Sequence, residues 1–123
     1  MSLKKIAVIG AGSWGTALAH ILSEKGHEID LWVYESELCR IIKDQHENSY
    51  FLPGIKLSGK ISPSNDIEQV VSNKSVIVLV LPTHAIRKVV ATFQHLIRPG
   101  CLIINASKGI ENETLCTIDK ILK

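Results

Sequence analysis

The fold is decided by residues 4–26, which read KKIAVIGAGSWGTALAHILSEKG. After its two lysines, this stretch begins with a short apolar run that ends at Ile9, which predicts a buried strand. From Trp14 onward, apolar residues recur at three- and four-residue spacing, which predicts a helix with one apolar face that ends near Gly26. The glycines of Gly10-x-Gly12-x-x-Gly15 therefore belong to a turn between a strand and a helix.

Strand and helix patterns alternate along the rest of the chain. Further strands are predicted within residues 26–35, near Ile61, over 75–82 and over 101–105, the last two as buried strands. Helices are predicted over 36–47, from 65 to 71, from 83 to a stop at Arg98-Pro99-Gly100 and over 111–123. This alternation predicts one α/β domain over residues 1–123, a doubly wound and mostly parallel sheet with helices on both faces.

Three of these helices carry predicted N-terminal caps, and one connection is unusually long. Ser36 and Thr83 are predicted as N-caps, and Asn65 with Glu68 resembles a capping box. Residues 48–60, between the second helix and the third strand, form a turn-rich loop long enough to suggest a function of its own.

Composition excludes several classes of protein. Of the 123 residues, 46% are hydrophobic and 21% charged, which is typical of a folded globular domain. The net charge of +2 is scattered, so no nucleic-acid partner is expected. Because no apolar run reaches the roughly 20 residues of a membrane helix and no signal peptide is recognisable, we expect no membrane span and a cytoplasmic location. The three cysteines are odd in number and far apart, so no disulfide framework is expected. Neither they nor the five histidines show metal-ligand spacing, so no metal is expected.

The glycine turn predicts a dinucleotide site. A doubly wound sheet binds its ligand outside the carboxyl ends of the strands, where the strand order reverses. There, Gly10 allows the tight turn, Gly12 lets the backbone approach a pyrophosphate, and Gly15 lets helix and strand pack closely. Free N–H groups and the positive end of the helix dipole face the phosphates.

Glu35 favours NAD as the dinucleotide. It stands 20 residues after Gly15, at the end of the second strand, where a carboxylate accepts hydrogen bonds from ribose hydroxyls and repels a 2′-phosphate. No arginine stands at 34–36, and Arg40 is one helical turn further on. A carboxylate stabilised by the helix dipole is the plainer interpretation of Glu35, and both can hold together. NAD is therefore expected, with NADP as the second choice.

Five segments in order carry a family resemblance. GAGSWGTALA (10–19), LWVYE (31–35), HENSYFLPG (46–54), VLPTHA (80–85) and SKGIE (107–111) closely resemble the amino-terminal, Rossmann-type domain of NAD(P)-dependent glycerol-3-phosphate dehydrogenase. The resemblance covers essentially the whole chain. It implies an oxidoreductase that interconverts sn-glycerol 3-phosphate and dihydroxyacetone phosphate for phospholipid synthesis. Bacterial members often carry basic or histidine residues in place of Tyr34-Glu35 and accept NADP, and this departure again favours NAD here.

The resemblance also implies roles for single residues. Ser13, Trp14 and Tyr34 are expected to contact the cofactor, and Ala85 to lie near it after the fourth strand. Lys108 is expected to reach both the cofactor and the phosphorylated substrate. Position alone favours a solvated loop lysine at 108, and only the family resemblance favours a ligand role for it. Trp14 is equally a core residue.

The resembling enzymes continue into a helical domain that supplies the general base. We therefore expect no catalytic base among these 123 residues. A stand-alone NAD-binding or redox-sensing module remains an alternative, as does the first domain of another two-domain dehydrogenase of the hydroxyacyl-CoA or ketopantoate type. The fifth strand, CLIIN (101–105), is expected to be an edge of the sheet that invites a second copy of the chain, so a homodimer is expected.

Overall fold

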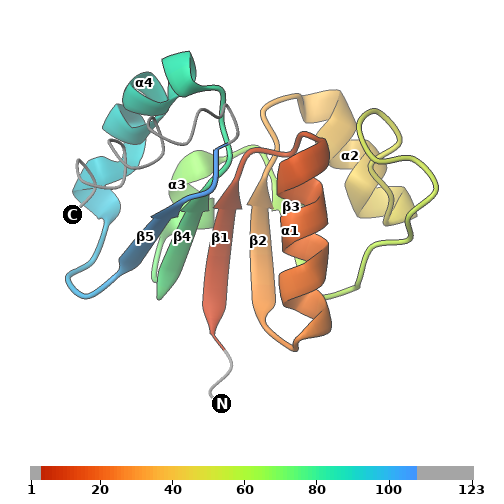
Figure 1. The fold of residues 1–123 in the computed structure, drawn as a ribbon, viewed down its shortest axis with the longest axis horizontal. Helices are drawn as coiled ribbons and strands as arrows, with labels where there is room; N and C mark the ends of the chain where they lie inside the picture. The colour runs from red at the N-terminus through yellow and green to blue at the C-terminus, as the bar shows by residue number, and fades with distance from the viewer. Residues whose placement is uncertain (1–3, 108–123) are drawn as a thin grey trace.

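The computed structural model describes residues 4–107, which fold into a five-stranded parallel sheet between two layers of helices (Figure 1). The strands are β1 (Lys5–Ile9), β2 (Glu28–Trp32), β3 (Ile61–Ser64), β4 (Val76–Leu79) and β5 (Leu102–Asn105). The helices are α1 (Ser13–Glu24), α2 (Ser36–Gln45), α3 (Ile67–Val71), α4 (Thr83–Phe93) and the 3-10 turn η1 (Gln94–Leu96). The predicted helix over 111–123 lies outside the described residues.

The sheet order is β3-β2-β1-β4-β5, and every pair is parallel. The chain moves outward from β1 to β3, crosses the sheet and continues outward from β4 to β5 (Figure 1). The reversal of strand order therefore falls between β1 and β4, as a doubly wound fold requires. The predicted fold class is confirmed.

Alternating side chains of the strands build two separate cores. In β1, Ile6 and Val8 pack with α1 and α2, whereas Ala7 and Ile9 pack with α3 and α4. All four residues are buried, because β1 is central and covered on both faces. This double layer holds the carboxyl ends of the strands in a fixed arrangement, from which the candidate site is built.

The three predicted helix caps are each wrong by one residue. Glu35 caps α2, because its carbonyl accepts the Cys39 N–H at 2.9 Å and Ser36 is already helical. Pro82 caps α4 in place of Thr83, since its carbonyl accepts the Ala85 N–H at 2.8 Å. Asp66, rather than Asn65, caps α3.

The Asp66 cap has a clear geometric cause. Its carboxylate accepts the N–H groups of Glu68 and Gln69 at 3.1 and 3.4 Å, the two amides that an N-cap side chain reaches. Asn65 instead uses its carbonyl to accept the Trp32 indole N–H at 3.1 Å.

The fifth strand is less buried than expected. Leu102 and Ile104 are 57% and 42% exposed, although both lie in the strand predicted as buried. Within residues 4–107, β5 is one of the two outer strands, and α1 packs over β1, β2 and β3 on the face to which Leu102 and Ile104 point. The expectation of an edge strand is met in this part of the chain.

Candidate functional site

The glycine turn joins β1 to α1 at the carboxyl end of the sheet. Gly10 has φ 122°, and a Cβ atom on it would clash with the carbonyl of Val80. A Cβ on Gly15 would clash with the carbonyl of Gly10, so this glycine lets α1 pack directly on the turn. A Cβ on Gly12 would have no atom of residues 4–107 within 4 Å. Gly10 thus allows the tight turn, Gly12 leaves an open approach to the backbone, and Gly15 allows α1 to pack on the turn.

Gly12 faces a shallow depression with free amide groups. The depression, about 320 Å³, is lined by Gly12–Gly15 and by Val80, Leu81 and Pro82 after β4. Within residues 4–107, no acceptor is bonded to the N–H groups of Gly12, Ser13, Trp14 and Gly15, as is usual in the first turn of a helix. Four donors at the positive end of α1 fit a pyrophosphate, and the missing Cβ of Gly12 leaves room for it.

Trp14 forms the rim of this depression and is not a core residue. Its side chain is 43% exposed, and its indole N–H donates to the carbonyl of Ala106 at 3.0 Å. This hydrogen bond joins the start of α1 to the chain just after β5. The structure therefore rules out the core interpretation, and Trp14 is available as a wall of a ligand site.

Tyr34 and Glu35 follow β2 at the same end of the sheet. Tyr34 is 76% exposed, and its ring packs edge-on against Trp32 with centroids 5.9 Å apart. The Glu35 backbone caps α2, while its carboxylate makes no capping hydrogen bond and is exposed to solvent. The carboxylate is free to accept hydrogen bonds from a ribose. Arg40, on the next turn of α2, is also exposed.

The ends of β4 and β5 are joined by Ser107. Its hydroxyl donates to the Leu79 carbonyl at 3.2 Å and accepts the Leu81 N–H at 2.9 Å, and the residue is 3% exposed. Ala85 is half-buried in the first turn of α4, which begins at this edge. The next residue, Lys108, lies outside the described residues, so its expected role stays a prediction.

Asn48 is a site residue that sequence reasoning missed. It is fully buried at the start of the 48–60 loop, and its side-chain amide donates to the Ala11 carbonyl and the Thr16 hydroxyl, both at 2.8 Å. It thus ties the long loop to the glycine turn. The position of Asn48 within the HENSYFLPG segment was the one sequence signal of a role. Its hydrogen-bond partners lie 37 and 32 residues away along the chain, so no local pattern reveals them.

The same loop carries two exposed aromatic rings. Tyr50 and Phe51 are 47% and 43% exposed, and their rings meet edge-on with centroids 6.2 Å apart. A hydrogen bond to the Glu37 carboxylate raises the pKa of Tyr50, and the nearby charge of Glu35 adds a smaller effect in the same direction. The loop therefore lies beside the start of α2.

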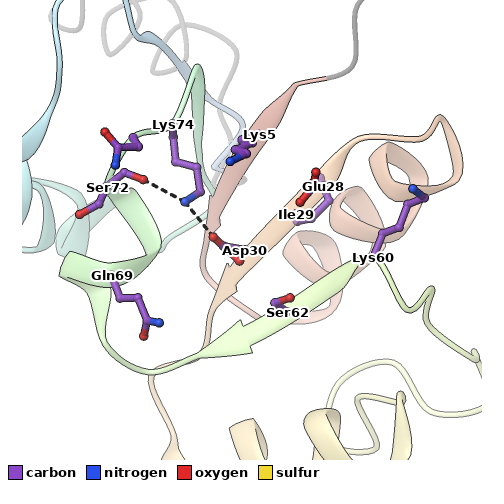
Figure 2. A pocket seen from close by; sticks show the side chains of 10 residues that line it. Lys5, Glu28, Ile29, Asp30, Lys60, Ser62, Gln69, Ser72 and Lys74 are labelled. Atoms are coloured by element: carbon purple, nitrogen blue, oxygen red, sulfur yellow. Dashed lines mark hydrogen bonds and ion pairs between the residues drawn. The ribbon is translucent and has the colours of Figure 1, made fainter.

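A second pocket lies at the opposite, amino end of the strands (Figure 2). Its volume is about 340 Å³, and three lysines reach it: Lys5, Lys60 and Lys74. Lys74 is buried, and its ammonium group donates to Asp30 at 2.8 Å and to the Ser72 carbonyl at 3.0 Å. This paired cation holds β4 against β2 and α3, so the pocket has a structural explanation.

Neither a metal cluster nor a membrane-spanning helix occurs within residues 4–107. No group of three or more histidine, cysteine or acidic side chains is placed to hold a metal ion. No helix in this range is long and apolar enough to cross a membrane. The half-buried thiols of Cys39 and Cys101 are unpaired here and pack against the two cores.

Comparison with known proteins gives a consistent result. Residues 5–123 match the family described as the NAD-dependent glycerol-3-phosphate dehydrogenase N-terminus. Glycerol-3-phosphate dehydrogenase [NAD(P)+] of Syntrophobacter fumaroxidans is 46% identical over 116 residues, which are 94% of this chain and 34% of that protein. The enzyme of the same name from Geobacter sulfurreducens is 47% identical over 118 residues, 96% of this chain and 35% of that protein.

The similarity extends to solved structures. The crystal structure of glycerol-3-phosphate dehydrogenase from Coxiella burnetii superposes with a TM-score of 0.82 at 30% identity, covering 94% of this chain and 37% of that one. The chain thus spans about a third of the length of the relatives that it matches.

Proposed function

The chain belongs to the NAD-dependent glycerol-3-phosphate dehydrogenase family, as its N-terminal domain, and on this premise we propose that it binds the nicotinamide dinucleotide for that reaction. The cofactor, when bound, supplies or accepts the hydride in the interconversion of sn-glycerol 3-phosphate and dihydroxyacetone phosphate. Residues of the chain bind and orient it. The proposed phosphorylated substrate is a small molecule that meets the nicotinamide beyond the ends of β4 and β5.

One observation carries the proposal: free N–H groups at the start of α1 face an open depression beside Gly12. Backbone amides at a helix N-terminus favour an anion, and the pyrophosphate is the anionic centre of the cofactor. Ser13 and Trp14 border the same depression. We assign the pyrophosphate to this turn and, from the family resemblance, the nicotinamide side to the region of Ala85 and Lys108.

We further propose that NADH binds more tightly than NADPH. Glu35 is exposed at the end of β2 and makes no capping hydrogen bond to α2, so a 2′-phosphate there would meet its negative charge. Calorimetric titration of both cofactors at one ionic strength tests this, with Glu35→Gln as the variant. We expect the preference for NADH to shrink in Glu35→Gln. Equal or tighter binding of NADPH by the unsubstituted chain contradicts the proposal.

Turnover tests the function at the level of the reaction. The 123 residues are expected not to reduce dihydroxyacetone phosphate with NADH, because they match only about a third of the length of the relatives. A purified sample that does reduce it would show that the chain holds its own proton donor. Loss of that turnover in Lys108→Ala would place Lys108 at the reacting centre.

Self-association and a cytoplasmic location are also proposals. The exposed side chains of Leu102 and Ile104 lie on β5, an outer strand of the described sheet, and such an edge favours pairing with a second copy of the chain. A homodimer paired through β5 is expected to dissociate in Ile104→Lys. Sedimentation at micromolar concentration measures this, and a monomer in the unsubstituted chain overturns the dimer.

A further inference from the structure

The buried amide of Asn48 has one orientation that satisfies all of its partners. Its nitrogen donates to the Ala11 carbonyl and the Thr16 hydroxyl, and its oxygen accepts the Phe51 N–H at 3.0 Å. Exchanging nitrogen and oxygen would point an oxygen at the Ala11 carbonyl and a donor at the Phe51 N–H. With the residue fully buried, no water is available to compensate for such an exchange.

This side chain controls the direction of the peptide between Ala11 and Gly12. No cis peptide bond occurs in the described chain, so the carbonyl and the N–H of this peptide point in opposite directions. Asn48 holds the Ala11 carbonyl toward the interior. The Gly12 N–H therefore points away from the interior, on the side where Gly12 borders the open depression.

We propose that Asn48 is a positioning residue that turns the Gly12 N–H toward the cofactor's pyrophosphate. This inference rests on the proposed dinucleotide function and deepens it. The hydrogen bond from Asn48 also polarises the peptide, which makes the Gly12 N–H a stronger donor to an anion. Asn48 acts through the backbone and does not touch the ligand.

Asn48 also connects the 48–60 loop to the glycine turn. Its side chain accepts the Phe51 N–H, and its carbonyl accepts the Leu52 N–H at 2.9 Å. A second tether of this loop avoids the turn: the Glu47 carboxylate accepts the Gly54 N–H at 3.0 Å. Removing the Glu47 carboxylate loosens the loop and leaves the Ala11 carbonyl held, which provides a matched control.

The test compares ADP, which carries a pyrophosphate, with adenosine, which carries none. In Asn48→Asp, the two N–H donors are replaced by a carboxylate oxygen facing the Ala11 carbonyl. We expect the affinity for ADP to fall about 10- to 100-fold, the value of a hydrogen bond to a charged group, while that for adenosine stays within about twofold. In Glu47→Ala, the ratio of the two affinities is expected to stay unchanged.

Each outcome decides between the inference and its premise. If the unsubstituted chain binds neither NADH nor ADP, the proposed function fails, and the inference with it. If it binds both, but Asn48→Asp keeps the ADP preference or Glu47→Ala loses it equally, only the role of Asn48 is overturned. Should Asn48→Asp fail to fold, the unsubstituted chain decides by NMR. ADP, and not adenosine, is expected to shift the Gly12 amide and the Asn48 side-chain amide signals, and unmoved signals overturn the inference.

Discussion

Gly12→Ala is expected to separate cofactor binding from stability. The backbone of Gly12 has φ −73°, which alanine adopts without strain, and the added methyl group meets no atom of the described chain within 4 Å. Alanine is a poorer N-cap than glycine, but it also lowers the entropy of the unfolded chain, and the two effects are of similar size. We expect the free energy of unfolding to change by less than about 0.5 kcal/mol.

The same methyl group occupies the approach to the free amides of the turn. A pyrophosphate displaced from these donors loses hydrogen bonds to a charged group, each worth about 1.5–3 kcal/mol. The expected result is a fall in NADH affinity of about tenfold or more, measured by calorimetric titration beside a urea unfolding curve. NADH binding as tight as in the unsubstituted chain refutes the placement of the pyrophosphate at Gly12.

Gly15→Ala is the matched comparison. Its methyl group would clash with the Gly10 carbonyl and lie 3.4 Å from the Val80 side chain. Such overpacking lowers the free energy of unfolding by about 1–3 kcal/mol, and the better helix propensity of alanine offsets about 1 kcal/mol of this loss. We therefore expect Gly15→Ala to lower the urea midpoint clearly, where Gly12→Ala does not. Equal stability losses in the two variants would contradict the packing described for this turn.

Two other predictions concern regions away from the turn. In Asp30→Asn, the buried Lys74 ammonium loses its carboxylate partner and keeps only neutral oxygen acceptors, and because Asp30 is partly exposed we expect a loss of about 1–3 kcal/mol in urea unfolding with NADH affinity unchanged; an unchanged unfolding curve would contradict the structural role of this pair. Burial raises the pKa of the Cys39 and Cys101 thiols, so fewer thiolates exist at a given pH and iodoacetamide labelling of both is expected to accelerate only above the ordinary thiol pKa of about 8.5. Peptide mass spectrometry across a pH series measures this, and fast labelling at neutral pH would contradict it.

Local sequence patterns predicted most of the fold. The apolar runs that became β1 and β4 are buried on both faces, and the stripe of Ile86 and Phe93 became the buried side of α4. Glycine spacing also predicted the distinct packing of Gly10 and Gly15, because a strand-to-helix turn leaves few alternatives.

Features that depend on distant residues were beyond such patterns. Asn48 gains its role from Ala11 and Thr16, which only the folded chain brings near it. The exposure of Ile104 depends on the absence of a neighbouring strand within residues 4–107, whereas its apolar sequence suggested burial. Helix caps were missed by one residue, since the cap is set by which carbonyl accepts the first helical hydrogen bond and not by residue type alone.

A crystal structure of the chain with NADH would test the dinucleotide site most directly. The pyrophosphate is expected within hydrogen-bond distance, about 2.7–3.2 Å, of the N–H groups of Gly12 and Ser13 at the start of α1. The adenosine ribose is expected beside Glu35, after β2. A pyrophosphate bound instead at the opposite end of the sheet, among Lys5 and Lys60, would contradict this account.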